Sequence, residues 1–178
     1  MIVTRGLYPP ITVYGGGANC LAFPIALNEL SATGNATWPA NNRAIYIPLS
    51  LEDDFVLNAF GHVQGVAATG NYDIGVYDFT GTRLASLGST GVGATGVTKI
   101  VTVTPILLPK GGYFIGYSFS STTNQVSRMQ LGTPLLNAIG VRQEANALPL
   151  PNPATFALAA SDYFPYVVFL QGLYAHSA

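Results

Sequence analysis

Charged residues are scarce in this sequence. Asp, Glu, Lys and Arg make up 8% of its 178 residues, whereas an ordinary soluble domain carries roughly 25%. A coiled coil or long helical bundle needs such residues on its wet faces, so the scarcity excludes both classes. Seven cationic residues beside eight anionic ones also leave no stripe of positive charge to follow phosphates, which excludes a basic nucleic-acid-binding protein.

Cysteine and long apolar runs are also nearly absent. Cys20 is the single cysteine, which excludes an intrachain disulfide and a cysteine-based metal cluster. The longest apolar runs fall far short of the ~20 residues that a membrane-spanning helix needs, and the first ten residues lack the apolar core of a signal peptide. We therefore expect a protein that is made in a cytoplasm and has no membrane partner.

The shortage of charge itself predicts contact with other proteins. A monomer with so few charges tends to associate, and protein interfaces are depleted of charge at their centres. We expect much of the surface to meet neighbouring chains.

The sequence does contain the two-residue period of β-strands. Residues 1–40 are broken by glycine and proline and predict an irregular N-terminal arm, whereas a strand pattern begins near Arg43 and continues to the end of the chain. Short strands joined by Gly/Pro turns at spacings of roughly ten residues are typical of a β-sandwich or barrel. We predict one all-β domain over residues 41–178, and expect it to fold without residues 1–38.

Strand alternation assigns individual faces. Phe55 and the alternate residues up to Val63 are expected on one face of their strand, opposite Val56, Phe60 and His62. The same reasoning places Asp73 on an outward face and residues 78–82 in a tight turn, and it ends the strand of Lys99 to Thr104 before the prolines of residues 105–109.

The ionisable residues do not suggest a catalytic site, and no cofactor or metal is expected. Glu52, Asp53 and Asp54 are either a solvated loop or, with backbone carbonyls, a calcium site. Asp73 and Asp78 would form a glycosidase pair only in a common cleft, and two histidines without a nucleophile motif do not suggest a triad.

Three aromatic residues are the candidates for binding. Trp38, Tyr46 and an outward Tyr77 have the composition of a flat platform for sugar rings. The alternative is that they cover the edges of the core or anchor a protein interface, where Tyr and Trp are also enriched. We favour the alternative.

The stretch GNYDIGVYDFTGTRLASLGST at residues 70–90 resembles a family of bacteriophage virion proteins. The likeness extends over residues 43–170: it begins with RAIYIPL (43–49), includes LPKGGYFIGY (108–117) and LLNAIGVRQ (135–143), and ends with ALPLP (147–151) and ATFALAASDYFP (154–165). Such proteins fold as a jelly-roll-like antiparallel β-sandwich, so the resemblance implies this fold.

The resemblance also implies a role. It implies a non-enzymatic structural protein of the virion, most simply a capsid decoration, cement or minor shell component that binds a major capsid or tail protein. We expect a homotrimer. The alternative is a carbohydrate- or host-receptor-binding module of a tail fibre or tail accessory protein, which would use the loops at residues 64–70, 88–98 and 120–128.

Overall fold

The chain folds into antiparallel sheets, and the computed structural model describes residues 12–14, 20–22, 35–96, 98–165 and 168–174. A five-stranded sheet has the order β1 (Thr12–Tyr14), β2 (Cys20–Ala22), β15 (Val168–Tyr174), β5 (Phe55–Val63) and β9 (Thr98–Leu108). A seven-stranded sheet has the order β13 (Ala157–Leu158), β12 (Arg142–Glu144), β4 (Arg43–Leu51), β10 (Gly111–Phe119), β6 (Asn71–Tyr77) and β7 (Arg83–Ser86), with β8 (Thr90–Gly91) also paired to β6.

A smaller sheet and one short helix complete the described fold. The three-stranded sheet has the order β14 (Tyr163–Pro165), β11 (Gln125–Gln130) and β3 (Asn35–Thr37). Helix α1 covers Thr133–Ala138 and has no side-chain hydrogen bond at its N-cap. No helix in the described part of the chain is long and apolar enough to cross a membrane.

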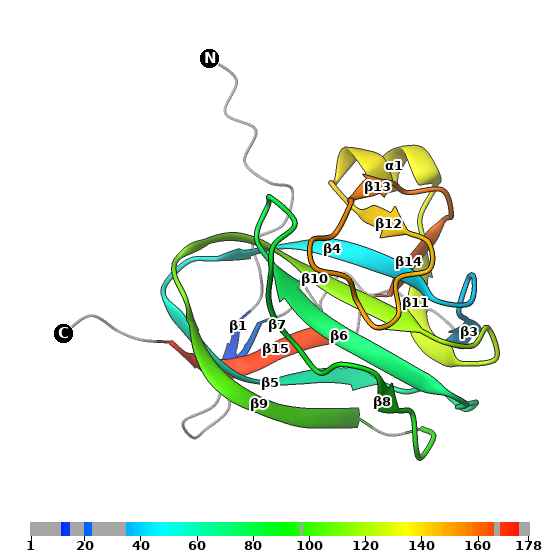
Figure 1. Ribbon diagram of the computed structural model, residues 1–178, viewed down its shortest axis with the longest axis horizontal. Helices are drawn as coiled ribbons and strands as arrows, with labels where there is room; N and C mark the ends of the chain where they lie inside the picture. The colour runs from blue at the N-terminus through cyan, green and yellow to red at the C-terminus, as the bar shows by residue number, and fades with distance from the viewer. Residues whose placement is uncertain (1–11, 15–19, 23–34, 97, 166–167, 175–178) are drawn as a thin grey trace.

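The two larger sheets form the layers of a sandwich. Figure 1 shows β4, β10 and β6 in one layer and β15, β5 and β9 in the other, with α1, β12 and β13 at one end. This arrangement confirms the predicted all-β antiparallel sandwich, whereas the jelly-roll connectivity stays a prediction.

One long antiparallel ribbon links the two layers. Residues 43–51 pair with 111–119 in the seven-stranded sheet, and residues 55–63 pair with 98–108 in the five-stranded sheet. Both chain segments of the ribbon, residues 43–63 and residues 98–119, turn from one sheet into the other at the left of Figure 1. We call this turn the corner of the ribbon. Asp54 fastens this corner, because its Oδ1 accepts a hydrogen bond from the Lys110 backbone N–H at 2.8 Å.

The core between the layers comes from alternate residues of the central strands. On β6 these are Tyr72, Ile74 and Val76, as the sequence pattern predicts. On β10 they are Tyr113, Ile115, Tyr117 and Phe119, which also match the predicted inward face. A fully buried aromatic side chain removes 150–250 Å² from water, so these rings supply much of the hydrophobic stabilisation.

A bulge at Asn58 overturns the predicted faces of β5. Leu57 pairs with Gly172 and Ala59 with Gln171, so Asn58 is an extra residue relative to β15. Because one inserted residue reverses the alternation, the inward residues are Phe55 and Leu57 before the bulge but Phe60 after it.

The strand predicted to end at Thr104 is longer, and part of the predicted N-terminal arm is in strands. The prolines and leucines of residues 105–109 do not end the strand, because β9 continues to Leu108 after a register shift beside the bulge in β5. The N-terminal residues are not wholly irregular, since β1, β2 and β3 lie within the predicted arm and join two of the sheets. The other residues before 35 lie outside the described part of the chain.

Candidate functional site

Trp38 lies in the core. Its side chain is 1% exposed, and its Nε1 donates a hydrogen bond to the Arg43 carbonyl at 2.9 Å. Three rings surround it edge-on, those of Tyr117, Phe119 and Tyr163, with centroids 5.1 to 5.3 Å away. A ring enclosed in this way offers no face to a ligand, so its proposed part in a sugar platform is wrong.

Tyr46 and Tyr77 lie together on the outer face of the seven-stranded sheet, away from Trp38. Both are fully buried, with ring centroids 5.3 Å apart. Gly116 lies between them, and a Cβ atom there would come within about 3.0 Å of both rings. The expectation of an exposed Tyr77 is therefore wrong, although strand alternation assigned it to the correct side of the sheet.

A covering segment, defined here as residues 144–156, buries this outer face. Its Ala147, Leu150, Ala154 and Phe156 pack with Tyr46, Tyr77, Ala44 and Phe114 in a second hydrophobic cluster. Figure 1 shows the segment in orange, crossing the sheet between β12 and β13. The sandwich thus has a second core outside its two layers.

Hydrogen bonds of both tyrosine hydroxyls fasten the covering segment. The Tyr46 hydroxyl donates to Glu144 Oε2 at 2.9 Å, and the Tyr77 hydroxyl donates to the Pro151 carbonyl at 2.8 Å. Burial raises the pKa of both phenols far above their ordinary value of 10.0. Both phenols therefore remain neutral hydrogen-bond donors, and their role is to hold the covering segment on the sheet.

The β6–β7 hairpin holds the other end of the segment. Arg83 donates from its guanidinium to the Leu150 carbonyl and from its backbone N–H to Asn152 Oδ1, the latter at 3.0 Å. The Ala154 N–H donates to the Gly81 carbonyl at 2.9 Å. The β6–β7 hairpin thus contacts the covering segment directly.

Asp73 is buried beneath the covering segment, although the sequence pattern placed it in solvent. Its Oδ2 accepts a hydrogen bond from the Leu150 N–H at 3.0 Å. Burial raises the pKa of this carboxyl from 3.8 to about 6. The Arg83 charge and hydrogen bonds from the backbone N–H groups of Leu150, Gly88 and Ile74 offset only part of the increase. Ser118, its cross-strand partner, is buried as well.

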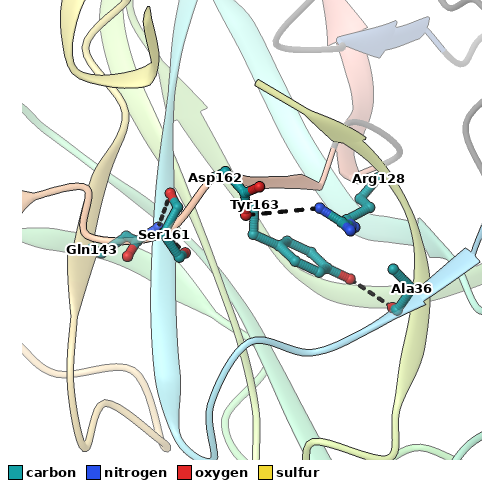
Figure 2. Close-up of polar contacts among 6 residues, drawn as sticks. All are labelled: Ala36, Arg128, Gln143, Ser161, Asp162 and Tyr163. Atoms are coloured by element: carbon teal, nitrogen blue, oxygen red, sulfur yellow. Dashed lines mark hydrogen bonds and ion pairs between the residues drawn. The ribbon is translucent and has the colours of Figure 1, made fainter. Parts of the chain in front are cut away.

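Polar contacts around Tyr163 fasten the three-stranded sheet (Figure 2). The Tyr163 hydroxyl donates to the Ala36 carbonyl at 2.8 Å, which connects β14 to β3. The Arg128 guanidinium lies 5.0 Å from the Tyr163 ring centroid, and its Nη1 is 4.0 Å from Asp162 Oδ1. Because Asp162 is substantially exposed, this ion pair contributes little to stability.

A second set of contacts attaches residues 159–161 to the seven-stranded sheet and to α1. Gln143 Nε2 donates to Ser161 Oγ at 2.8 Å, as Figure 2 shows. Asn137 Oδ1 accepts a hydrogen bond from the Ala159 N–H at 2.7 Å. Both side-chain amides thus connect residues 159–161 to the rest of the fold, so their role is structural.

The remaining ionisable candidates lie apart from one another. His62 is buried, with its ring centroid 4.6 Å from that of Tyr72 and its Nε2 3.4 Å from Gln64 Oε1. His176 lies outside the described residues. Glu52 and Asp53 are exposed beside the corner that Asp54 fastens. Among the described residues, no three His, Cys, Asp or Glu side chains gather where they could hold a metal ion.

The outer face of the five-stranded sheet is an uncharged surface. The pairing aligns Leu107, Val56 and Leu173 in one row, and Ile100, Gly61 and Phe169 in another. Leu107, Ile100 and Leu173 are 56%, 50% and 38% exposed, whereas Ala59 and Phe169 are buried, at 0% and 3%. Between the rows lie Thr102, Ala59 and Gln171. We call these nine residues the outer apolar face.

Phe79 is an exposed aromatic residue that the sequence reasoning overlooked. It lies in the turn between β6 and β7 and is 61% exposed. Its ring contacts Phe114 in a perpendicular arrangement, with centroids 5.2 Å apart. The turn signal of residues 78–82 was recognised in the sequence, but it does not reveal where a side chain in the turn points.

Comparison of the chain with protein-family models, with curated proteins and with solved structures finds no significant match.

Proposed function

We propose that the protein is a non-enzymatic structural component of a bacteriophage particle, in which neighbouring protein chains cover the outer apolar face. The resemblance of residues 70–90 to virion proteins supports the location in the virion. The observation that carries the proposal is the outer apolar face itself: none of its nine residues is charged, and its two leucines and its isoleucine are 38% to 56% exposed.

An uncharged, half-exposed apolar surface favours protein association. Interface centres are depleted of charge, and burial of apolar area contributes roughly 25 cal/mol per Å². Each row ends at a residue of β9, and β9 is the last strand in the order of the described five-stranded sheet. A partner can therefore lie across the face and along the strand edge together.

The described polar groups support a structural role. The buried phenols of Tyr46 and Tyr77 and the carboxyl of Asp73 each hydrogen-bond to the covering segment. Their positions are explained by folding alone. We propose a decoration, cement or minor shell protein that associates as a homotrimer and binds a major capsid or tail protein.

Charge introduced into the outer apolar face is expected to weaken association. Leu107→Lys and Leu173→Lys should each lower the self-association constant by about tenfold or more, which corresponds to about 1.4 kcal/mol, because a lysine ammonium would lose its hydration in the interface. Sedimentation equilibrium and native mass spectrometry measure the effect. Leu135→Lys is the matched control, since Leu135 is 48% exposed on α1.

Two outcomes would contradict this proposal. The wild-type chain would remain monomeric at high protein concentration, or Leu135→Lys would weaken association as much as Leu107→Lys. Mass spectrometry of purified particles tests the location directly. Many copies per particle would support a shell component, a few copies would indicate the tail, and absence from particles would refute a virion role.

A further inference from the structure

The turn that carries Phe79 is held rigidly. Asp78 Oδ1 accepts hydrogen bonds from the Thr80 N–H, the Thr80 hydroxyl and the Thr82 N–H, at 2.7 to 2.9 Å. Gly81 adopts a positive φ of 92°, and its carbonyl accepts the hydrogen bond from Ala154. Little conformational entropy remains to be lost if a ligand binds here.

The Phe79 ring is itself supported on two sides. A Cβ atom at Gly112 would lie 2.1 Å from Phe79 Cε2 and 2.4 Å from Cζ, so the ring stands with this edge against the glycine. Phe114 supports it at an interplanar angle of 89°, and Phe114 in turn contacts Phe156 at 4.6 Å. Phe79 is thus held in place by Gly112 and Phe114 while it remains 61% exposed.

The surroundings of Phe79 differ from those of the outer apolar face. The same turn carries polar groups: the Asp78 carboxylate and the hydroxyls of Thr80 and Thr82, which lie 3.1 Å apart. Hydrogen bonds from Thr80 hold the pKa of Asp78 below its ordinary value, so this carboxylate stays an acceptor at neutral pH. One exposed ring beside several acceptors is too small an apolar area for a protein interface of standard size.

A sugar ring fits this combination. The C–H groups on one side of a pyranose carry partial positive charge and match the negative face of an aromatic ring. Its hydroxyls donate hydrogen bonds, and the lone pairs of Asp78 and the two threonines accept them. A nucleic acid fits less well, because stacking of bases is normally accompanied by a cationic groove and the chain carries a net charge of -1.

We propose that Phe79 is the stacking residue of a subsite for one neutral pyranose unit of a glycan, with Asp78, Thr80 and Thr82 as hydrogen-bond acceptors. This subsite is distinct from the outer apolar face, so it adds a binding activity to the structural role. It also moves the sugar-binding hypothesis from the buried Trp38, Tyr46 and Tyr77 to the exposed turn.

The test uses the full chain and defined sugars. Saturation-transfer NMR with the methyl glycosides of glucose, galactose, mannose and N-acetylglucosamine should show transfer to at least one of them, and a glycan array should identify longer ligands. Phe79→Ala should lower the affinity at least tenfold, whereas Phe79→Tyr should retain it because the stacking face is kept. Leu158→Ala is the matched control, since Leu158 is 65% exposed on β13 and should not matter.

Each other outcome would overturn the proposal. These outcomes are no binding to any array glycan or methyl glycoside, binding that Phe79→Ala leaves unchanged, or a preference for single-stranded oligonucleotides over sugars. Thermal unfolding of every variant is measured in parallel. If Phe79→Ala unfolds, the test uses the folded Asp78→Ala and Thr80→Val variants instead. Loss of sugar binding in these variants would support the subsite, and retained binding in both would refute it.

Discussion

Replacing Trp38 with alanine is expected to lower the free energy of unfolding by about 3–5 kcal/mol, the usual range for removing a buried aromatic side chain. The substitution removes the edge contacts with Tyr117, Phe119 and Tyr163 and the hydrogen bond to the Arg43 carbonyl. It leaves a cavity where the three-stranded sheet meets the main core. Denaturant unfolding followed by circular dichroism measures the loss.

The conservative variant separates packing from hydrogen bonding. Trp38→Phe keeps most of the ring contacts and should cost less than Trp38→Ala. Because Trp38 is the single tryptophan, wild-type fluorescence provides a further check. We expect emission typical of an apolar environment and protection from iodide quenching. A quenchable tryptophan and an unchanged stability of Trp38→Ala would support the irregular arm that the sequence pattern suggested.

The contribution of Asp73 to the free energy of unfolding is expected to fall by about 3 kcal/mol as the pH rises from about 4 to 7, at about 1.36 kcal/mol per pKa unit. The folded pKa of about 6 lies above the ordinary 3.8, so the folded state binds the proton more tightly. The stabilisation is therefore complete below pH 3.8 and is lost as the pH rises through 6. Above this range the buried carboxylate is charged, with Arg83 as its nearby cation.

Asp73→Asn isolates this contribution. The amide oxygen can still accept the hydrogen bond from the Leu150 N–H, while the group no longer titrates. We expect the variant to be at least as stable as the wild type at pH 7 and less sensitive to pH between 4 and 7. The difference between the two unfolding curves measures the Asp73 contribution alone, because the other titrating groups are common to both. Parallel pH profiles would contradict the assignment.

In β6, strand alternation predicted correctly on which face of the sheet a residue lies, but it did not predict whether that residue is exposed to solvent. It assigned Asp73 and Tyr77 correctly to the face opposite Tyr72 and Ile74. However, it could not show that residues 144–156 would cover that face, because the covering segment has no periodicity and its contacts are distant in sequence. A second hydrophobic cluster outside the sandwich therefore made outward residues into buried ones.

The bulge at Asn58 shows a different limit. Nothing in the residues around it marks an insertion, since the bulge exists only relative to the partner strand. The alternation of β5 therefore reversed at a point that no local pattern identifies. Trp38 was missed for a related reason: glycine and proline on both sides suggested a loop, whereas its burial depends on rings from β10 and β14.

The bent ribbon has a consequence for how the chain reaches this structure. Its strands pair residues 43–63 with residues 98–119, and residues 64–97 must be looped out before the first of these pairs can form. Chains dominated by such distant pairings fold slowly, on the scale of milliseconds to seconds. Because the ribbon belongs to both layers, neither layer can be completed while the other is open, and the two should form and melt in a single cooperative step.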